Sequence, residues 1–573
     1  MNRLGLGKKQ VRYNRELIVG LIAGILITFT AWAWGGVVLW TQWVTAGLGL
    51  LALVFALLPS TREKWQSRTI RWRLTFSIFG GVAVFVFAVV RRLLEIRELR
   101  QATLQLIPGA DLPPLGLKDW GEAPLLLGLG TTLFLALLTG LARSSGASSR
   151  LIRFPFFWLG LLLFAWIICQ SLNPWGKVIQ RDLYWYIISQ DHIAWLPSGL
   201  DAPFASTEEP GGMNGWRQLL ILSGPWALMC ALRISIERRR VFAWLAVTAA
   251  ANGLAVALSG NLARINKWSD FLGLSDPDRK TPSFGPFIYN NHAGAYLCLA
   301  ASLALALTFY LAKRKGDQVD RGGPHLITGI IALFLAIGAA STMSFAAVAA
   351  AASIIVIIAP VAYLLDRKLR NNLSLMPVLA LLALGTVIVY VGLLSIDTNR
   401  WRYKANVKIE RIEQLGADDR APLRAATWQM IESASIERQL FGWGAGTYRW
   451  TSPDFLKTQA VFLNKHGELA KRATHAHNDW LQAPVEWGLA GWALIICFVG
   501  YFCRRLMGLA RHPAAPSIAL VAGLLLFAAH AFFDFLLFIP QLTLLAIIVP
   551  WLHVLESSSR TTESIPAPSS APF

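Results

Sequence analysis

Polar residues gather in a short stretch that leads into a long apolar segment. The sequence THAHNDWLQAPVEW carries His475, His477, Asn478, Asp479 and Glu486. Polar groups are costly near hydrocarbon unless they are satisfied or functional. A histidine there is a candidate general base, and the amide of Asn478 beside it is a candidate for orienting a substrate hydroxyl. His475 and His477 are two residues apart, and no third ligand is apparent, so we expect no metal at this site.

Two arginines four residues apart form a second candidate site. In DDRAPLRAATWQMIESA, Asp419 suits a helix cap and Pro422 suits the first helical turn. Arg420 and Arg424 would then share a helix face near its positive N-terminal end, where a phosphate or carboxylate is expected to dock. A solvated charged face is the alternative interpretation.

A glycine-rich stretch, FGWGAGTYRW, lies between these two sites. It lacks the GK[ST] ending and the preceding strand of a nucleotide-binding loop. We therefore interpret it as a structural turn, since glycines let the backbone bend tightly.

Two further polar clusters lie at the ends of apolar segments. SFGPFIYNNHAGAYL contains Asn291 and follows a loop with Arg279 and Lys280, and HAFFDF links the last two apolar segments. In the latter, His530 and Asp534 are four apart, so the carboxylate orients the imidazole if a helix continues through the bend. A helix cap or an interhelical hydrogen bond also explains each cluster alone. The expected topology, however, places all of these clusters on one side of a membrane.

Composition excludes an ordinary soluble globule. Charged residues make up 15% of the 573 residues, against roughly 25% in soluble proteins. The net charge of +20 comes from basic clusters that lie between apolar segments, so it indicates membrane topology and not nucleic-acid binding. The five cysteines lie in apolar segments without a CxxC pair, which argues against disulfides and zinc.

The apolar segments predict an all-α integral membrane protein with about 14 transmembrane helices, in a range of about 12 to 14, because each is long enough to span a bilayer. A large, partly helical external loop precedes the twelfth span. The predicted spans are residues 17–40, 44–60, 74–90, 124–142, 154–170, 217–232, 241–259, 287–311, 325–341, 346–365, 374–393, 482–502, 515–533 and 534–552.

The excess of Lys and Arg in alternate loops places both termini in the cytoplasm. The predicted regions are N-terminal transmembrane helices at 1–153, a transmembrane core at 154–393 with an external loop at 171–216, a large external loop at 394–480 with the Arg and His motifs, C-terminal transmembrane helices at 481–552, and a disordered cytoplasmic tail at 553–573.

The pattern formed by His477, Asn478, Gly488 and Gly491 resembles the O-antigen ligase and polymerase superfamily of bacterial multi-pass glycosyltransferases. It fits that family's His-[Asn/Ser/Gln]-x9-Gly-x2-[Gly/Thr/Tyr] pattern in full. Arg424 with Trp428 resembles the family's Arg-x3-Leu element, although the apolar partner is larger.

Two weaker elements extend the resemblance to roughly residues 240–552. GPFIYNNHAG is similar to the family's Gly-Asn-Pro-Asn element, with Asn290 in place of proline. Arg279 and Lys280, six and five positions before Gly285, are alternative matches for a family arginine. HAFFDFLLFIP resembles a C-terminal His-x3-Asp and proline element, whereas the first three predicted spans look like an addition.

The resemblance implies transfer of a glycan from undecaprenyl diphosphate to an acceptor hydroxyl, on lipid A core or another glycan, at the periplasmic face of the bacterial inner membrane. It implies an inverting, metal-independent reaction without a cofactor. His477 would be the catalytic base. The implied diphosphate-binding residues are Arg424, Arg420, Arg279 and Lys280, with Arg424 first, and the supporting residues are Asn478, His475, Glu486, Asn291, His530 and Asp534.

Three alternatives remain open at this point. A polysaccharide polymerase of the same superfamily would join one lipid-linked repeat to another, and a protein O-oligosaccharyltransferase would use a protein acceptor. A polysaccharide flippase or transporter would also have many spans. A transporter is expected to carry charged residues along a central path, whereas here they gather at one rim.

Overall fold

The computed structural model describes residues 3–57, 150–181, 184–204, 213–265, 284–313, 323–372, 406, 420–469, 473–537, 539 and 541–563. Within these residues, nine helices are long and apolar enough to cross a membrane, and two shorter apolar helices follow at the C-terminal end. The chain is therefore a mostly helical membrane protein, as predicted. The predicted spans at 74–90, 124–142 and 374–393 lie outside the described residues, as do Arg279, Lys280 and Asp419.

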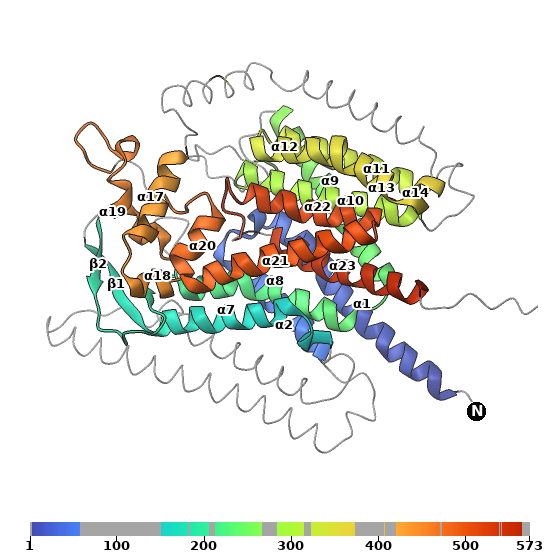
Figure 1. Cartoon of the computed structure of the whole chain (residues 1–573), viewed down its shortest axis with the longest axis horizontal. Coiled ribbons are helices and arrows are strands. Elements are labelled where there is room, and N and C mark those ends of the chain that lie inside the picture. The colour runs from blue at the N-terminus through green and yellow to red at the C-terminus, as the bar shows by residue number, and fades with distance from the viewer. Residues whose placement is uncertain are drawn as a thin grey trace, which may run out of the picture.

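The helices of the membrane region run side by side in one part of the molecule, and the short helices and strands lie at its other end (Figure 1). The membrane-region helices are α1 (Arg3–Trp32), η1 (Trp34–Gly36), α2 (Leu39–Leu57), α7 (Pro155–Leu172), α8 (Gly215–Ser235), α9 (Arg239–Ile265), α10 (Asn290–Ala312), α11 (Pro324–Ser341), α12 (Phe345–Ser353), η4 (Ile354–Ile358), α13 (Ala359–Leu365), α14 (Arg367–Asn372), α21 (Leu489–Arg511), α22 (Ala515–His530) and α23 (Gln541–Glu563).

Helix α10 is the buried centre of this bundle and packs against α9, α11 and α22. Its sequence is rich in alanine, and small residues let helix backbones approach closely in a membrane. A Cβ added at Gly523 of α22 would lie 2.6 Å from Cβ of Ser302 on α10. This close packing holds Asn290 and Asn291, at the start of α10, in a fixed position.

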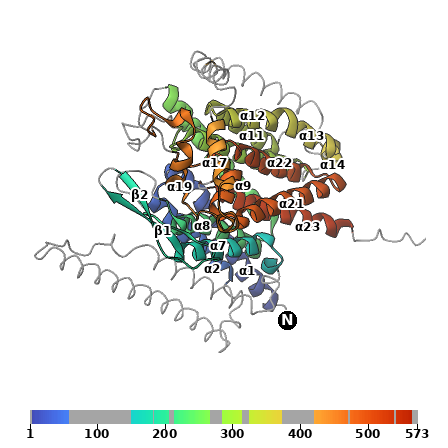
Figure 2. The same ribbon diagram turned by 60° about the vertical axis from the view of Figure 1, so that its left-hand side comes forward.

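The part of the described chain beside the helix bundle consists of short helices and a small sheet. The helices are α17 (Ala421–Glu432), α18 (Ile436–Phe441), α19 (Tyr448–Leu456), η5 (Ala460–Phe462) and α20 (Asp479–Trp487). The strands are β1 (Pro174–Arg181), β2 (Tyr184–Ser189) and β3 (Gly199–Asp201), in the order β2-β1-β3. Strand β1 pairs antiparallel with β2 and parallel with β3. In Figure 2, strands β1 and β2 lie at one edge of the molecule, and α17 and α19 are seen in front of the helix bundle.

The small sheet corrects the all-α prediction, which included no strands. All three strands lie in the segment that was predicted as a loop at 171–216. Aromatic and β-branched residues dominate the stretch LYWYIIS, and such residues favour strands. This strand signal was missed in the all-α prediction.

Four predicted spans have different ends in the structure. The span at 17–40 ends at Trp32, because Gly35 and Gly36 adopt positive φ. The span at 482–502 is broken at Gly488 into α20 and α21. The spans at 515–533 and 534–552 are separated by a segment between His530 and Gln541 that is not helical where the structure describes it.

The tail that was predicted to be disordered from residue 553 is helical up to Glu563, where α23 ends. Glu556 in this extension forms an ion pair with Arg505 of α21. That pairing gives the helix a partner beyond its apolar part.

Candidate active site

His477 and Asp534 form a hydrogen-bonded pair where the start of α20 meets the turn after α22. Nδ1 of His477 lies 3.1 Å from Oδ1 of Asp534. The Asp534 side chain is fully buried, whereas the His477 side chain is 27% exposed. The imidazole is therefore accessible while its partner carboxylate is protected, and Asp534 fixes the ring orientation.

The second carboxylate oxygen of Asp534 faces two other predicted site residues. Nδ2 of Asn291 donates a hydrogen bond to Oδ2 of Asp534, and Nη2 of Arg420 lies 4.0 Å from the same atom. The hydroxyl of Tyr289 accepts hydrogen bonds from Arg420 at 3.3 Å and from Asn291 at 3.1 Å. Asp534 thus joins the histidine, the amide and one arginine in a single cluster.

Neighbouring groups stabilise the negative charge of the Asp534 carboxylate. Burial would raise the pKa of this carboxyl, but the hydrogen bond from His477 and the positive charge of neighbouring groups, including Arg420, hold the pKa below its ordinary value. We infer that Asp534 remains ionised at neutral pH.

The backbone around the pair is held by the N-terminus of α20. His477 adopts a left-handed conformation with φ of 49°, and Asn478 caps the helix by accepting a hydrogen bond from the amide of Leu481. Asn478 is therefore a structural cap in this structure. Asp479 accepts hydrogen bonds from the amides of Leu536 at 2.6 Å and Leu537 at 3.1 Å. These bonds fix the segment that carries Asp534.

Glu486 anchors the glycine-rich loop to the other end of α20. Its carboxylate accepts hydrogen bonds from the amides of Gly446 at 3.0 Å and Tyr448 at 3.3 Å, and from the side chains of Gln482 and Gln218. The loop amides are thus satisfied within the protein, as expected for a structural turn. Burial raises the pKa of Glu486 to about 6, although these hydrogen bonds oppose the shift.

The two glycines of the family-like pattern allow close packing around α20. Gly488 has φ of 54°, and a Cβ there would lie 2.4 Å from the carbonyl oxygen of Leu440. A Cβ at Gly491 would lie 2.4 Å from the carbonyl oxygen of Ala483. Both positions therefore require glycine for the fold that carries His477, which explains the spacing in physical terms.

His475 has a different environment from His477. Its ring stacks on Phe535 with centroids 4.1 Å apart, and Nδ1 lies 3.3 Å from Nε2 of Gln482. Withdrawal from water, together with positive neighbours such as His477, lowers the pKa of His475 to about 3. His475 therefore packs against the aromatic ring as a neutral side chain.

The structure does not pair His530 with Asp534. Helix α22 ends at His530, so the chain turns before Asp534 and the carboxylate meets His477. Nε2 of His530 is buried without a hydrogen-bond partner among the described residues. Arg424 is half-buried, one helical turn after Arg420 in α17.

A cavity of about 420 Å³ opens beside this cluster. Arg420, Asn291 and His530 line one part of it, and small or apolar residues of α12, α22 and the turns beside these helices line the rest. We name it the Arg420 cavity. Its combination of a cation with an apolar wall suits a molecule that joins an anionic group to a hydrocarbon chain.

Within the described ranges, no three His, Cys, Asp or Glu side chains are placed to hold a metal ion together. His477 points to Asp534, His475 to Phe535, and Asp479 to backbone amides. The two histidines and Asp479 are therefore engaged separately.

Two contributors to the cluster were not singled out from the sequence. Tyr289 bridges Arg420 and Asn291 through its hydroxyl, and Phe535 packs against both His475 and His477. Each is adjacent in sequence to a predicted site residue, Asn290–Asn291 in one case and Asp534 in the other. The sequence signal that could have identified both residues is an aromatic side chain next to a polar cluster at the end of an apolar segment.

Residues 327–496 match the family model described as O-Antigen ligase. This match includes Arg420, Arg424, His477 and the two glycines of the pattern, and it supports a relation of this part of the chain to the O-antigen ligase superfamily. The resemblance seen in the sequence is thereby confirmed. A search of curated proteins found no match.

Proposed function

We propose that this chain is an O-antigen ligase-like glycosyltransferase that moves a glycan from undecaprenyl diphosphate to an acceptor hydroxyl. The reaction would take place at the periplasmic face of the bacterial inner membrane. The observation that carries this proposal is the cluster in which Asp534 contacts both His477 and Arg420, directly beside the Arg420 cavity. This cluster brings a candidate base, His477, and a cation, Arg420, together around one carboxylate.

The pair supports a role for His477 as general base. With Nδ1–H donating to Asp534, Nε2 carries the lone pair and accepts the proton of the acceptor hydroxyl. The acceptor oxygen then forms a bond to the anomeric carbon as the bond from that carbon to the diphosphate oxygen breaks. The diphosphate departs with the electron pair, and Asp534 stabilises the imidazolium that has formed.

Arg420 supports the leaving-group side of the reaction. The departing diphosphate gains negative charge, and a fixed guanidinium stabilises that charge without a divalent ion. Arg420 already lies at the polar end of the cavity. Arg424, Arg279 and Lys280 remain proposed partners for the diphosphate, and the reaction is proposed to be inverting and metal-independent.

The test is transfer by the purified full chain in nanodiscs, with a synthetic polyprenyl-diphosphate glycan as donor. We expect His477→Ala to lose about two to four orders of magnitude in turnover, the usual range for a positioned base, with donor binding retained. His475→Ala is the matched control and should lose much less. Equal activity of His477→Ala and wild type would refute the assignment, and so would loss of wild-type activity to a chelator with recovery on adding a divalent ion.

A polymerase of the same superfamily is the second candidate, because the family match is shared by both activities. The same assay separates them when lipid A core and a second lipid-linked glycan are offered in parallel.

A further inference from the structure

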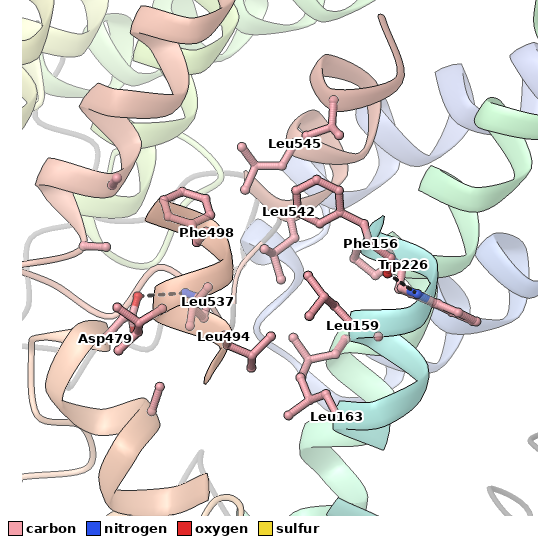
Figure 3. A pocket seen from close by; sticks show the side chains of 18 of the residues that line it. Phe156, Leu159, Leu163, Trp226, Asp479, Leu494, Phe498, Leu537, Leu542 and Leu545 are labelled. Atoms are coloured by element: carbon pink, nitrogen blue, oxygen red, sulfur yellow. Dashed lines mark hydrogen bonds between the residues drawn. The ribbon is translucent and has the colours of Figure 1, made fainter. Parts of the chain in front are cut away.

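A second cavity lies among α7, α8 and the helices from α20 to α23, and it shares no lining residue with the Arg420 cavity. Its volume is about 280 Å³, and we name it the α7–α21 cavity. Figure 3 shows leucine and phenylalanine side chains facing one another across it, with Asp479 at one side and Phe156 and Trp226 at the other. Asp479 follows His477 by two residues, so the end lined by Phe156 is remote from the candidate active site.

Basic side chains from three helices lie one turn beyond this remote end. Each of α8, α21 and α23 carries a lining residue that is followed, four positions later, by an arginine or a histidine: Met229 and Arg233, Tyr501 and Arg505, and Val549 and His553. Residues four apart lie on the same face of a helix. The three basic side chains therefore follow the cavity wall beyond the point where the cavity ends.

Contacts join these side chains into one group. Nη2 of Arg505 lies 3.1 Å from Nε2 of His553, and Cζ of Arg505 lies 4.8 Å from the centre of the Tyr501 ring. A guanidinium only donates hydrogen bonds, so Nε2 of His553 accepts this one. Arg233 is close enough to Arg505 and to Arg150 for their positive charges to act on it. The remote end of the cavity is thus bordered by a cationic group.

Arg233 is the uncompensated charge of this group. Arg505 forms an ion pair with Glu556, and Arg150 forms one with Glu237. Among the residues that the structure describes, Arg233 has no ion pair, and its Nε is buried without a hydrogen-bond partner. A buried donor without a partner is unfavourable, and a charge beside an apolar space is more so. The three arginines therefore carry one positive charge in excess, which a single anionic group would balance.

A phosphodiester attached to a hydrocarbon chain suits both parts of this site. It carries one negative charge, and guanidinium groups bind phosphate oxygens well. Along α7 the cavity lining runs from Phe156 to Phe164, which is about 12 Å at 1.5 Å per residue. That length is similar to the roughly 15 Å of hydrocarbon in one leaflet of a bilayer. Few residues of α7 and α21 are buried by the described part of the chain, so an acyl chain can enter from the bilayer.

We propose that Arg233 and Arg505 bind the phosphate of one anionic phospholipid, whose acyl chain lies in the adjoining end of the α7–α21 cavity. Arg505 lies about 24 Å along α21 from its start at Leu489, so the lipid belongs to the leaflet opposite the candidate active site. It links α21 to α8 at a place where α21 has few contacts with the described protein. The inference does not depend on the proposed reaction.

Native mass spectrometry of the purified full chain tests this site with two lipids that have the same acyl chains. Dioleoyl phosphatidylglycerol is the anionic probe, and dioleoyl phosphatidylcholine has a headgroup without net charge. We expect the wild type to bind one phosphatidylglycerol about tenfold more tightly than phosphatidylcholine, because only the anionic lipid balances the excess charge. Equal affinity of the wild type for the two lipids would overturn the inference.

Two variants compare the inferred contact with an exposed arginine. Arg233→Gln should weaken phosphatidylglycerol binding about tenfold, as expected for the loss of a charge-assisted hydrogen bond, and should leave phosphatidylcholine binding unchanged. Arg370→Gln removes an exposed arginine of α14 and should bind both lipids like the wild type. Unchanged binding of phosphatidylglycerol by a folded Arg233→Gln variant would overturn the inference, and so would an equal loss in both variants.

Inorganic phosphate distinguishes a lipid site from a site for a free anion. We expect a large excess of inorganic phosphate to leave phosphatidylglycerol bound to the wild type, because it lacks the chain that fills the apolar cavity. Release of the lipid by phosphate would contradict the role assigned to the cavity.

Photo-crosslinking of the wild type keeps the inference testable if Arg233→Gln fails to fold. The full chain in nanodiscs would be irradiated with phosphatidylglycerol that carries a diazirine in its acyl chain. We expect labels on Met229, Tyr501 or Val549, and we expect unlabelled phosphatidylglycerol to compete better than phosphatidylcholine. Labels confined to Leu494, near the start of α21, would overturn the inference, and so would equal competition by the two lipids.

Discussion

Asp534 accepts a hydrogen bond from His477 at 3.1 Å although 57 positions separate the two residues in the sequence. The bond joins the start of α20 to the turn after α22, and Asp479 reinforces the same junction through the amides of Leu536 and Leu537. The orientation of the proposed base therefore depends on two separate parts of the chain.

The first prediction concerns Asp534. Asp534→Asn retains the shape of the side chain but removes the charge that stabilises an imidazolium, and it no longer selects one tautomer of His477. We expect turnover to fall by about two to four orders of magnitude with KM for the donor little changed. Initial rates in nanodiscs over a range of donor concentrations would measure both constants.

The control is Asp454→Asn, because the Asp454 side chain is 76% exposed and pairs only with nearby Lys457 among the contacts of the described residues. It should retain wild-type activity. Turnover of Asp534→Asn within twofold of wild type would show that the carboxylate does not assist the base.

Sequence reasoning identified this pair only in part. His477 was recognised from the His-Asn pattern, but Asp534 was assigned to His530 because the two are four apart. That spacing matters only in a continuous helix, and α22 ends at His530. A contact between residues 477 and 534 depends on how α20 packs against the end of α22, which spacing alone does not reveal.

The membrane helices were easier to predict than their breaks. Long apolar segments indicate spans through composition alone, and this gave α7 through α11 nearly at their observed positions. The break at Gly488 depends instead on the contact with Leu440, and the turn after α22 depends on hydrogen bonds to Asp479. Such breaks are fixed by distant partners and carry little local signal.

The second prediction compares two arginines. The family-like motif alone favours Arg424, whereas the structure places Arg420 beside Asp534 and at the polar end of the Arg420 cavity. On this geometry we expect Arg420→Ala to reduce kcat/KM for the donor more than Arg424→Ala does. Arg420→Lys should restore only part of the loss, because an ammonium cannot reproduce the two-pronged contact of a guanidinium.

Titration of each variant with the lipid-diphosphate donor would give the comparison. A larger loss for Arg424→Ala would return the main phosphate contact to the residue that the motif indicates. Full activity of both variants would show that α17 does not contribute to binding of the donor.

The third prediction tests the glycine that separates α20 from α21. Gly488→Ala places a Cβ 2.4 Å from the carbonyl oxygen of Leu440 at a φ of 54°. We expect the free energy of unfolding to fall by about 2 kcal/mol or more, with loss of activity because α20 carries His477. Gly500→Ala in α21 is the control, since a Cβ there meets no atom within 4 Å. Thermal unfolding in detergent would measure the midpoint temperatures of both variants. An equal decrease for Gly488→Ala and Gly500→Ala would contradict the close-packing argument.

The last prediction uses the raised pKa of Glu486 in α20, the short helix that precedes the span α21. Burial raises this pKa from 4.5 to about 6, so the folded state binds the proton more tightly than the unfolded state. The resulting stabilisation is complete below about pH 4.5 and is lost as the pH rises through about 6, and a shift of this size corresponds to about 2 kcal/mol.

Glu486→Gln cannot titrate, and its amide group places a donor against the amides of Gly446 or Tyr448. We therefore expect the variant to be less stable than wild type at pH 5. The difference should shrink at pH 7, because ionisation of the buried Glu486 side chain destabilises only the wild type. Thermal midpoints of both proteins at the two pH values would measure this, and a difference that grows from pH 5 to pH 7 would show that the ionised carboxylate is the form that holds the glycine loop.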